Sequence, residues 1–176
     1  MRLSDQPGTE AEIRIEAAVS RVWDLVSDIA LPARLSPELQ RVEWLNGATG
    51  PAVGARFTGH NTHPRIGEWQ TVAEVVEYEP ERAFGWAVID AYGRYGEAVD
   101  DAANPMATWR FRLDAAPDGT LLRQSMRIGT GRSGLTVVVE RWPDKEAELI
   151  GGRLDEVRAG MEATLRGIKA LAEDND

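Results

Sequence analysis

His60 and His63 are the two histidines of this chain and its strongest candidates for acid–base chemistry or metal binding. Residues three apart in an extended strand point to opposite faces, so the two rings would meet at one metal ion only across a turn. Pro64 permits a turn, and Glu68 is the further ligand at a useful spacing. These residues are too few for a protein metal site, so we expect none. Histidines at the end of a loop are usually solvated, and the alternative is that His60 or His63 hydrogen-bonds a ligand or acts as a base.

Asn61 is a second polar candidate because it shares a predicted strand face with Phe57 and Gly59. A glycine in a strand leaves room beside it for a ligand, and the amide of Asn61 would then lie next to that room. In the alternative interpretation, Asn61 caps only its own turn. The sequence leaves both interpretations open.

Three glycines, Gly129, Gly131 and Gly134, match the spacing of the dinucleotide-binding fingerprint. Their context does not fit, because they follow the last predicted strand and no later strand presents an acidic residue to a ribose. We therefore expect a flexible connection over residues 129–143, and no nucleotide or other cofactor. Such a hinge would allow residues 135–142 to act as a flap over one end of a cavity.

Other catalytic arrangements are missing from the sequence. Glu97, Asp100 and Asp101 lie in a polar segment, residues 91–105, among alanines and glycines, so we interpret them as solvated charges rather than an acid–base pair. A connection this long is typically mobile or functional. The chain has no cysteine, which excludes disulfides, thiolate metal sites and a cysteine nucleophile.

Tryptophan is abundant for a chain of this length, with six residues: Trp23, Trp44, Trp69, Trp86, Trp109 and Trp142. Large rings on a concave sheet can stack on a ring-shaped ligand, and their indole N–H groups can orient it. They can equally fill a core. Both interpretations stay open for Trp69, Trp86 and Trp109, whereas Trp23 is expected in the core.

The elements that would position these residues are strands flanked by helices. Alternation of apolar and polar residues predicts seven strands, near residues 9–16, 42–44, 54–61, 67–78, 84–88, 109–113 and 122–128. Val19–Ser27 has the apolar spacing of a short helix, and the prolines at positions 32 and 37 enclose a second helical turn.

One long amphipathic helix is predicted to close the chain, at about residues 144–173. Its apolar residues recur every three or four positions, as a helix on an apolar surface requires. They are Leu154, Val157, Met161, Leu165, Ile168 and Leu171. Such a helix against a curved antiparallel sheet can enclose a space for a ligand.

Length and composition indicate a single globular domain. The chain has 176 residues, of which 43% are hydrophobic and 28% charged. Residues 1–8 are polar and contain Pro7-Gly8, so we expect a flexible N-terminal tail followed by one ligand-binding domain over residues 9–176.

The charge of the chain limits its partners. A net charge of −9 and a pI near 4.8 disfavour nucleic acid and anionic membrane surfaces, and favour an uncharged or cationic ligand. No stretch approaches the roughly 18 apolar residues of a membrane span, and the first residues lack the apolar core of a signal peptide. We expect a cytoplasmic protein, as a monomer or homodimer.

The order of these elements resembles the START/birch-pollen-allergen superfamily (SRPBCC), and within it the bacterial polyketide cyclase/dehydrase-type group. The similarity lies in residues 15–28 and 160–173, and in the motifs Ser36-Pro37-Glu38-Leu39, Phe57-x-Gly59-x-Asn61 and Thr108-Trp109-x-Phe111. The resemblance implies an α+β helix-grip fold. In that fold a seven-stranded curved antiparallel sheet surrounds the long C-terminal helix, two short helices follow the first strand, and a ligand cavity lies between sheet and helix.

The chain departs from the aromatic polyketide aromatase/cyclases of this superfamily. Those enzymes carry a serine and an arginine two and four residues after a tryptophan of the fourth strand, where this chain has Thr71 and Ala73 after Trp69. Alanine cannot polarise a carbonyl oxygen as a guanidinium does. Leu31 and Leu35 also replace aromatic residues of the helical turn. These differences count against that chemistry.

Three classes of function follow. The first is binding or transport of a small hydrophobic, ring-containing molecule, such as a polyketide, lipid or other secondary metabolite. Its predicted ligand-binding residues are Asn61, Trp69, Thr71, Ala73, Trp86 and Trp109. The second is a polyketide cyclase/dehydratase-type enzyme with Thr71, Asn61 and His60 as candidate catalytic residues. The third is a protein-interaction module with a filled core, and cavity volume separates it from the other two.

Overall fold

The structure is a computed structural model that describes residues 1–64 and 67–174. Its strands are β1 (Gly8–Ile15), β2 (Leu39–Trp44), β3 (Arg56–His63), β4 (Gly67–Glu79), β5 (Ala83–Ile89), β6 (Ala107–Ala116) and β7 (Gly119–Ile128). Its α-helices are α1 (Val19–Val26), α2 (Leu31–Leu35), α3 (Gly134–Arg141) and α4 (Glu146–Glu173), and two short 3-10 helices are η1 (Leu3–Asp5) and η2 (Pro143–Lys145).

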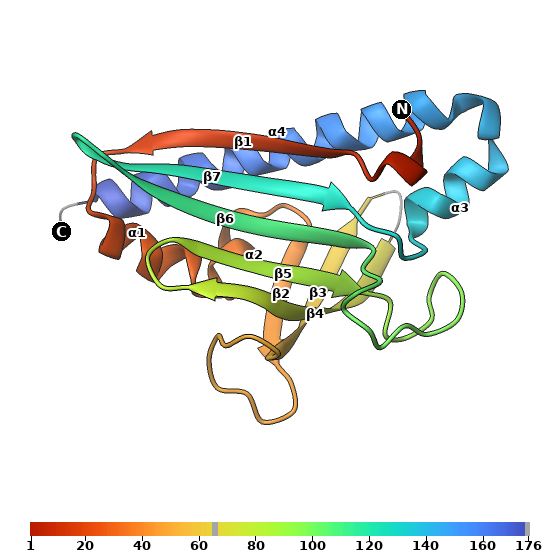
Figure 1. The fold of residues 1–176 in the computed structure, drawn as a ribbon, viewed down its shortest axis with the longest axis horizontal. Helices are drawn as coiled ribbons and strands as arrows, with labels where there is room; N and C mark the ends of the chain where they lie inside the picture. The colour runs from red at the N-terminus through yellow and green to blue at the C-terminus, as the bar shows by residue number, and fades with distance from the viewer. Residues whose placement is uncertain (65–66, 175–176) are drawn as a thin grey trace.

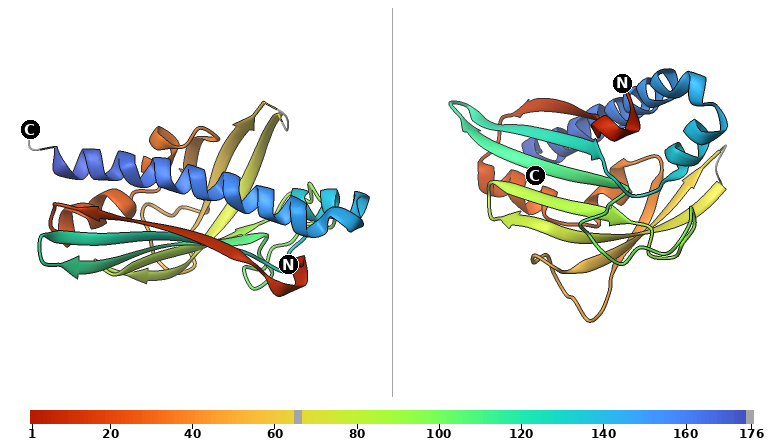
Figure 2. Two further views of the ribbon diagram at one scale, coloured as in Figure 1. Left: turned by 90° about the horizontal axis from the view of Figure 1, so that it is seen from above. Right: turned by 45° about the vertical axis from the view of Figure 1, so that its right-hand side comes forward.

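The strands form one antiparallel sheet in the order β1-β7-β6-β5-β4-β3-β2 (Figure 1). The sheet is curved, with β3 and β4 rising steeply from β6 and β7 on the side where α4 lies (Figure 2). Helices α1 and α2 occupy the long connection between β1 and β2. The predicted fold class is confirmed: a helix-grip arrangement of a seven-stranded antiparallel sheet, a long C-terminal helix and two short helices after the first strand.

The core lies between α4 and the concave face of the sheet. Five residues of the predicted apolar stripe are buried: Leu154, Val157, Met161, Leu165 and Ile168. Full burial of an aliphatic side chain of this size contributes roughly 1.5–3 kcal/mol, so this stripe holds the helix on the sheet. Helix α4 packs mainly against β1 and also contacts α1, α2, α3 and β7.

Residues 129–143, expected as a flexible connection, contain helix α3. Ser133 caps this helix: its Oγ accepts a hydrogen bond from the backbone N–H of Thr136 at 3.4 Å, and Thr136 Oγ1 accepts one from Ser133 N–H at 3.1 Å. The usual sequence signature of such a cap has glutamate or glutamine at the third position. Threonine takes that place here, which explains why the sequence pattern did not reveal the helix.

Residues 1–8 are joined to the rest of the molecule by hydrogen bonds. The backbone N–H of Leu3 donates to Glu146 Oε1 at 2.8 Å, and the carbonyl of Pro7 accepts from Ile128 N–H at 2.9 Å. Helix η1 lies in this segment, and β1 begins at Gly8. The division of the chain into a flexible tail and one domain stays a prediction.

Replacing Gly152 with alanine is expected to raise the free energy of unfolding by about 0.5–1 kcal/mol, because glycine inside a helix is less favourable than alanine by that amount. A Cβ at Gly152 would have no atom within 4 Å. Urea denaturation measures the change. Gly167→Ala is the matched control: its Cβ would lie 2.7 Å from Leu35 Cδ2, so no stabilisation is expected. Equal effects of the two changes would contradict the packing described.

Candidate functional site

The concave face of the sheet carries most of the predicted ligand-binding residues. Strand alternation puts Trp69, Thr71 and Ala73 on the inner face of β4. Trp86 on β5 is the cross-strand partner of Trp109 on β6. The structure therefore places these five residues on one face, although they come from three strands.

Trp86 lies at the centre of an aromatic cluster. Its ring is nearly parallel to that of Trp109, with an interplanar angle of 4° and 6.4 Å between centroids. Tilted contacts join it to Phe84 at 5.3 Å and to Phe111 at 5.8 Å. The two phenylalanines are buried, whereas the two tryptophans are only half-buried. This aromatic platform, Phe84, Trp86, Trp109 and Phe111, therefore leaves part of its indole surface uncovered.

A small inner pocket of about 60 Å³ lies beside the platform. It is lined by Val26, Asp28, Ile29, Pro32, Leu39, Val42, Phe57, Phe84, Trp86 and Phe111. By comparison, an engineered apolar cavity of about 150 Å³ binds benzene. The inner pocket has the apolar lining of a ligand site, but it must widen before it can hold a ring.

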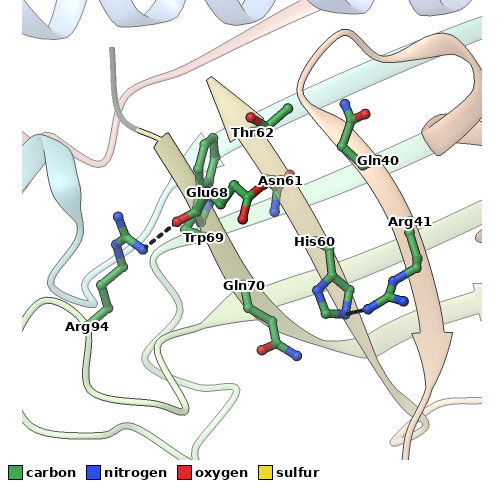
Figure 3. Close-up of a pocket in the computed structure, with 9 residues that line it drawn as sticks. All are labelled: Gln40, Arg41, His60, Asn61, Thr62, Glu68, Trp69, Gln70 and Arg94. Atoms are coloured by element: carbon green, nitrogen blue, oxygen red, sulfur yellow. Dashed lines mark hydrogen bonds between the residues drawn. The ribbon is translucent and has the colours of Figure 1, made fainter. Parts of the chain in front are cut away.

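A larger outer hollow of about 630 Å³ opens at the tips of β3 and β4 (Figure 3). Its lining residues are Gln40, Arg41, His60, Asn61, Thr62, Glu68, Trp69, Gln70 and Arg94. The volume falls in the range of small-molecule sites, roughly 300–1,000 Å³, but such sites are mostly apolar. The outer hollow has one aromatic side chain, Trp69, among polar groups.

Leu39 lines the inner pocket and contacts β3 at Gly59. Asn61 lines the outer hollow and Phe57 lines the inner pocket. Gly59 lies between these two residues along β3. A Cβ on Gly59 would lie 3.1 Å from both Leu39 Cδ1 and Thr71 Oγ1. The room that Gly59 leaves is therefore taken up in part by the Leu39 side chain, which also lines the inner pocket.

Asn61 makes a local hydrogen bond, in which its Nδ2 donates to the carbonyl of Gly59 at 3.4 Å. The position that a Cβ on Gly59 would occupy lies 3.1 Å from Thr71 Oγ1 and 3.8 Å from Asn61 Nδ2. The structure thus brings the hydroxyl and the amide together on the inner face. A role for either group toward a ligand stays a prediction.

His60 lies on the other face of β3 and contacts Arg41 on β2. The distance between the Arg41 guanidinium nitrogen and His60 Nε2 is 3.2 Å (Figure 3). A guanidinium only donates, so Nε2 accepts this bond. His60 therefore faces the outer hollow and not the inner pocket. A single ligand in the inner pocket cannot contact both His60 and Thr71.

No three His, Asp or Glu side chains gather into a metal-binding group within residues 1–64 and 67–174. The absence of a metal requirement stays a prediction. In the same part of the chain, none of the helices has the length and apolar character needed to cross a membrane.

Asp90 organises the segment of residues 91–105, a role that the sequence did not suggest. Its carboxylate is buried and accepts hydrogen bonds from the backbone N–H groups of Arg94 at 2.9 Å and Tyr95 at 2.8 Å. The Arg94 guanidinium donates to the carbonyl of Glu68 at 3.2 Å. Asp90 therefore sets the loop conformation that brings Arg94 to the wall of the outer hollow. An aspartate at a strand end followed by Gly93 was the available signal.

Asp90→Ala is expected to lower the free energy of unfolding by about 2 kcal/mol, because two backbone N–H groups lose a charged acceptor. Amide exchange of Arg94 and Tyr95 should speed up at the same time. Hydrogen exchange followed by mass spectrometry measures this. Asp118→Ala, at an exposed turn, is the control and should change neither quantity. Unchanged exchange in Asp90→Ala would contradict the assigned role.

The three glycines of the fingerprint-like motif pack against the same loop. A Cβ on Gly129 would lie 2.0 Å from the carbonyl oxygen of Pro105, and one on Gly131 would lie 2.6 Å from that of Asn104. Real side chains never approach so closely, so glycine is required at both positions. The glycines of this motif therefore allow residues 129–131 to pack closely against residues 104–105.

Arg132 ties α3 to this loop. Its Nε donates to the carbonyl of Tyr95, and its guanidinium forms two hydrogen bonds with Glu140. The bonds from Arg132 hold the pKa of Glu140 below its usual value. Movement of α3 as a flap would have to break this tether, and the flap stays a prediction.

Structures of similar shape come from several proteins. The solution NMR structure of a Polyketide_cyc-like protein from Corynebacterium glutamicum is 31% identical, covers 98% of this chain and 93% of its own, and has a TM-score of 0.64. The di-domain ARO/CYC StfQ from the steffimycin biosynthetic pathway has a TM-score of 0.67 at 17% identity, over 94% of this chain and 50% of StfQ. Ara h 8.0201 has a TM-score of 0.56 at 12% identity, over 94% of this chain and 97% of its own. No curated protein sequence matches the chain.

These similarities confirm the resemblance to the START/birch-pollen-allergen superfamily. The structures below 25% identity support the fold alone. A family model described as polyketide cyclase / dehydrase and lipid transport matches residues 6–173, which is nearly the whole chain. The chain therefore belongs to the polyketide cyclase/dehydrase and lipid transport family.

Proposed function

We propose that this protein binds or transports a small hydrophobic, ring-containing molecule on the concave face of its sheet. The observation that carries the proposal is the half-buried, nearly parallel pair of Trp86 and Trp109 beside the inner pocket. Aromatic rings contribute about 0.5–1.5 kcal/mol per stacked pair beyond the burial of their area. The family description names polyketides and lipids, which are hydrophobic molecules.

Access to this site would run along the inner face of β3 and β4, from the tips of these strands. Trp69 and Thr71 lie on the inner face of β4, and Phe57 lines the inner pocket. The Leu39 side chain, which covers Gly59, would move aside to open the inner pocket toward the strand tips. Rotation of a half-buried leucine is a small change, and it would widen an inner pocket that is too small for a ring at rest.

A second candidate function is a cyclase or dehydratase. It is favoured by the proximity of Thr71 Oγ1 and Asn61 Nδ2 above Gly59, since a hydroxyl and an amide can orient a substrate carbonyl. The position of His60 on the opposite face leaves this pair without a nearby histidine base. For that reason we rank binding above catalysis.

A third candidate is an interaction module with a filled core, and the small volume of the inner pocket favours it. Titration of the 15N-labelled protein with 2-methylnaphthalene separates it from ligand binding. If the proposed function is correct, the indole N–H resonances of Trp86 and Trp109 shift and saturate at one equivalent. Native mass spectrometry should show the same 1:1 complex. If neither resonance moves at the solubility limit of the probe, the interaction module becomes the better proposal.

A further inference from the structure

Gln124 places a polar amide in the apolar interior. It lies on the inner face of β7 between Leu122 and Met126, and only 6% of its surface is exposed. Its cross-strand neighbours are Ala11 on β1 and Phe111 on β6. Within the described residues, its Oε1 has no hydrogen-bond partner.

An unpartnered acceptor at this depth is unfavourable. Burial of such a group without a partner costs about 1–3 kcal/mol, and most buried polar atoms in folded proteins have a partner. Two other buried polar side chains have one: Thr58 Oγ1 donates to the carbonyl of Thr71 at 3.0 Å, and Thr120 Oγ1 donates to that of Ala17 at 2.8 Å. A leucine at position 124 would avoid the penalty, so the amide needs a separate explanation.

The surroundings of Gln124 connect it to the proposed ligand site. Its partner Phe111 lines the inner pocket and contacts the ring of Trp86. Trp109, two residues from Phe111 on the same face of β6, is the cross-strand partner of Met126. The amide therefore lies at the edge of the aromatic platform, on the side of β7.

We propose that Gln124 is the hydrogen-bonding anchor of this site and that its ligand is a neutral ring compound carrying a hydroxyl group. The inference rests on the proposed function and specifies the class of ligand. A hydroxyl both donates and accepts, so it can pair with the amide in either of the amide's two orientations.

A charged ligand group does not fit this position. The side chains next to Gln124 on the inner face are Ala11, Phe111, Leu122 and Met126, and none of them carries a charge. A carboxylate or phosphate buried here would lose its water without gaining a counter-ion, which is strongly unfavourable. The net charge of −9 further disfavours an anionic ligand.

The test is a thermodynamic cycle with two probes and two proteins. The probes are 2-naphthol and 2-methylnaphthalene, which differ by a hydroxyl in place of a methyl group. The proteins are the parent and Gln124→Met, which keeps the length of the side chain and removes the amide. We expect the substitution to weaken 2-naphthol binding about 5- to 10-fold, as loss of one buried hydrogen bond does. It should leave 2-methylnaphthalene binding unchanged or tighter.

A second measurement uses the parent protein alone, so it does not depend on folding of the variant. The side-chain NH₂ resonances of Gln124 should shift on addition of 2-naphthol and shift less with 2-methylnaphthalene. If both probes bind the parent, but Gln124→Met affects their binding equally and the two probes shift the NH₂ resonances equally, then Gln124 is not the anchor and the proposed function stands. If neither probe binds the parent, the proposed function fails and the anchor fails with it.

Discussion

Replacing Phe111 with alanine is expected to lower the free energy of unfolding by about 3–5 kcal/mol, among the largest effects for a single change in this chain. Phe111 is 1% exposed, pairs across the sheet with Phe84 and Gln124, and lies against Trp86. Its removal takes away the buried apolar area of a ring and leaves a cavity that the surrounding strands cannot close. Urea denaturation, monitored by tryptophan fluorescence, measures the change.

Val76→Ala is the matched control for this experiment, because Val76 is on the same sheet but is 41% exposed. We expect it to change stability by less than about 0.5 kcal/mol. The cavity left by Phe111→Ala would adjoin the inner pocket, so 2-methylnaphthalene should stabilise this variant more than it stabilises the parent. A loss of stability below about 1 kcal/mol would mean that Phe111 is not packed as described.

Replacing Trp86 with leucine is expected to weaken binding of 2-methylnaphthalene at least tenfold, about 1.4 kcal/mol, while the protein stays folded. Leucine keeps an apolar group at the wall of the inner pocket, but it loses the flat surface on which a ring can stack. The indole N–H resonance of Trp109 provides the titration signal in the variant, and circular dichroism reports whether the fold is kept.

Trp142→Leu serves as the control, because Trp142 lies outside both spaces, at the end of α3, with 47% of its surface exposed. Its binding constant should equal that of the parent. If Trp86→Leu binds as tightly as the parent and Trp69→Leu does not, the ring lies beside Trp69 at the tips of β3 and β4 instead of on the platform. That result would overturn the assigned position of the site and keep ligand binding.

The elements of this fold follow from local sequence patterns. Residues 84, 86 and 88 alternate inward on β5, and the apolar stripe of α4 recurs at helical spacing, because each pattern repeats the geometry of its own backbone. Helix α3 shows where this reasoning stops. Its cap uses a threonine at a position where the common signature has an acid or amide, so the local signal was absent.

Side-chain placement at the site depended on contacts between distant segments. Alternation predicted correctly that Trp69, Thr71 and Ala73 share a face, but it gave no information on the space beside them. That space is set by Leu39, which reaches over Gly59 from another strand. In the same way, the sequence did not suggest the role of Asp90. This role follows from its buried carboxylate, which accepts hydrogen bonds from two backbone N–H groups.

Local patterns thus predict the order of the strands and of helices α1, α2 and α4, the inward faces of the strands, and the resemblance to the family. Three features depend on the folded chain: His60 faces Arg41 away from Thr71, the inner pocket measures about 60 Å³, and the Oε1 of Gln124 lacks a partner among the described residues. Periodicity is a property of one segment, so it predicts that segment's secondary structure and inward face. Cavity volume and hydrogen-bond satisfaction instead depend on side chains that several strands and a helix bring together from distant parts of the chain.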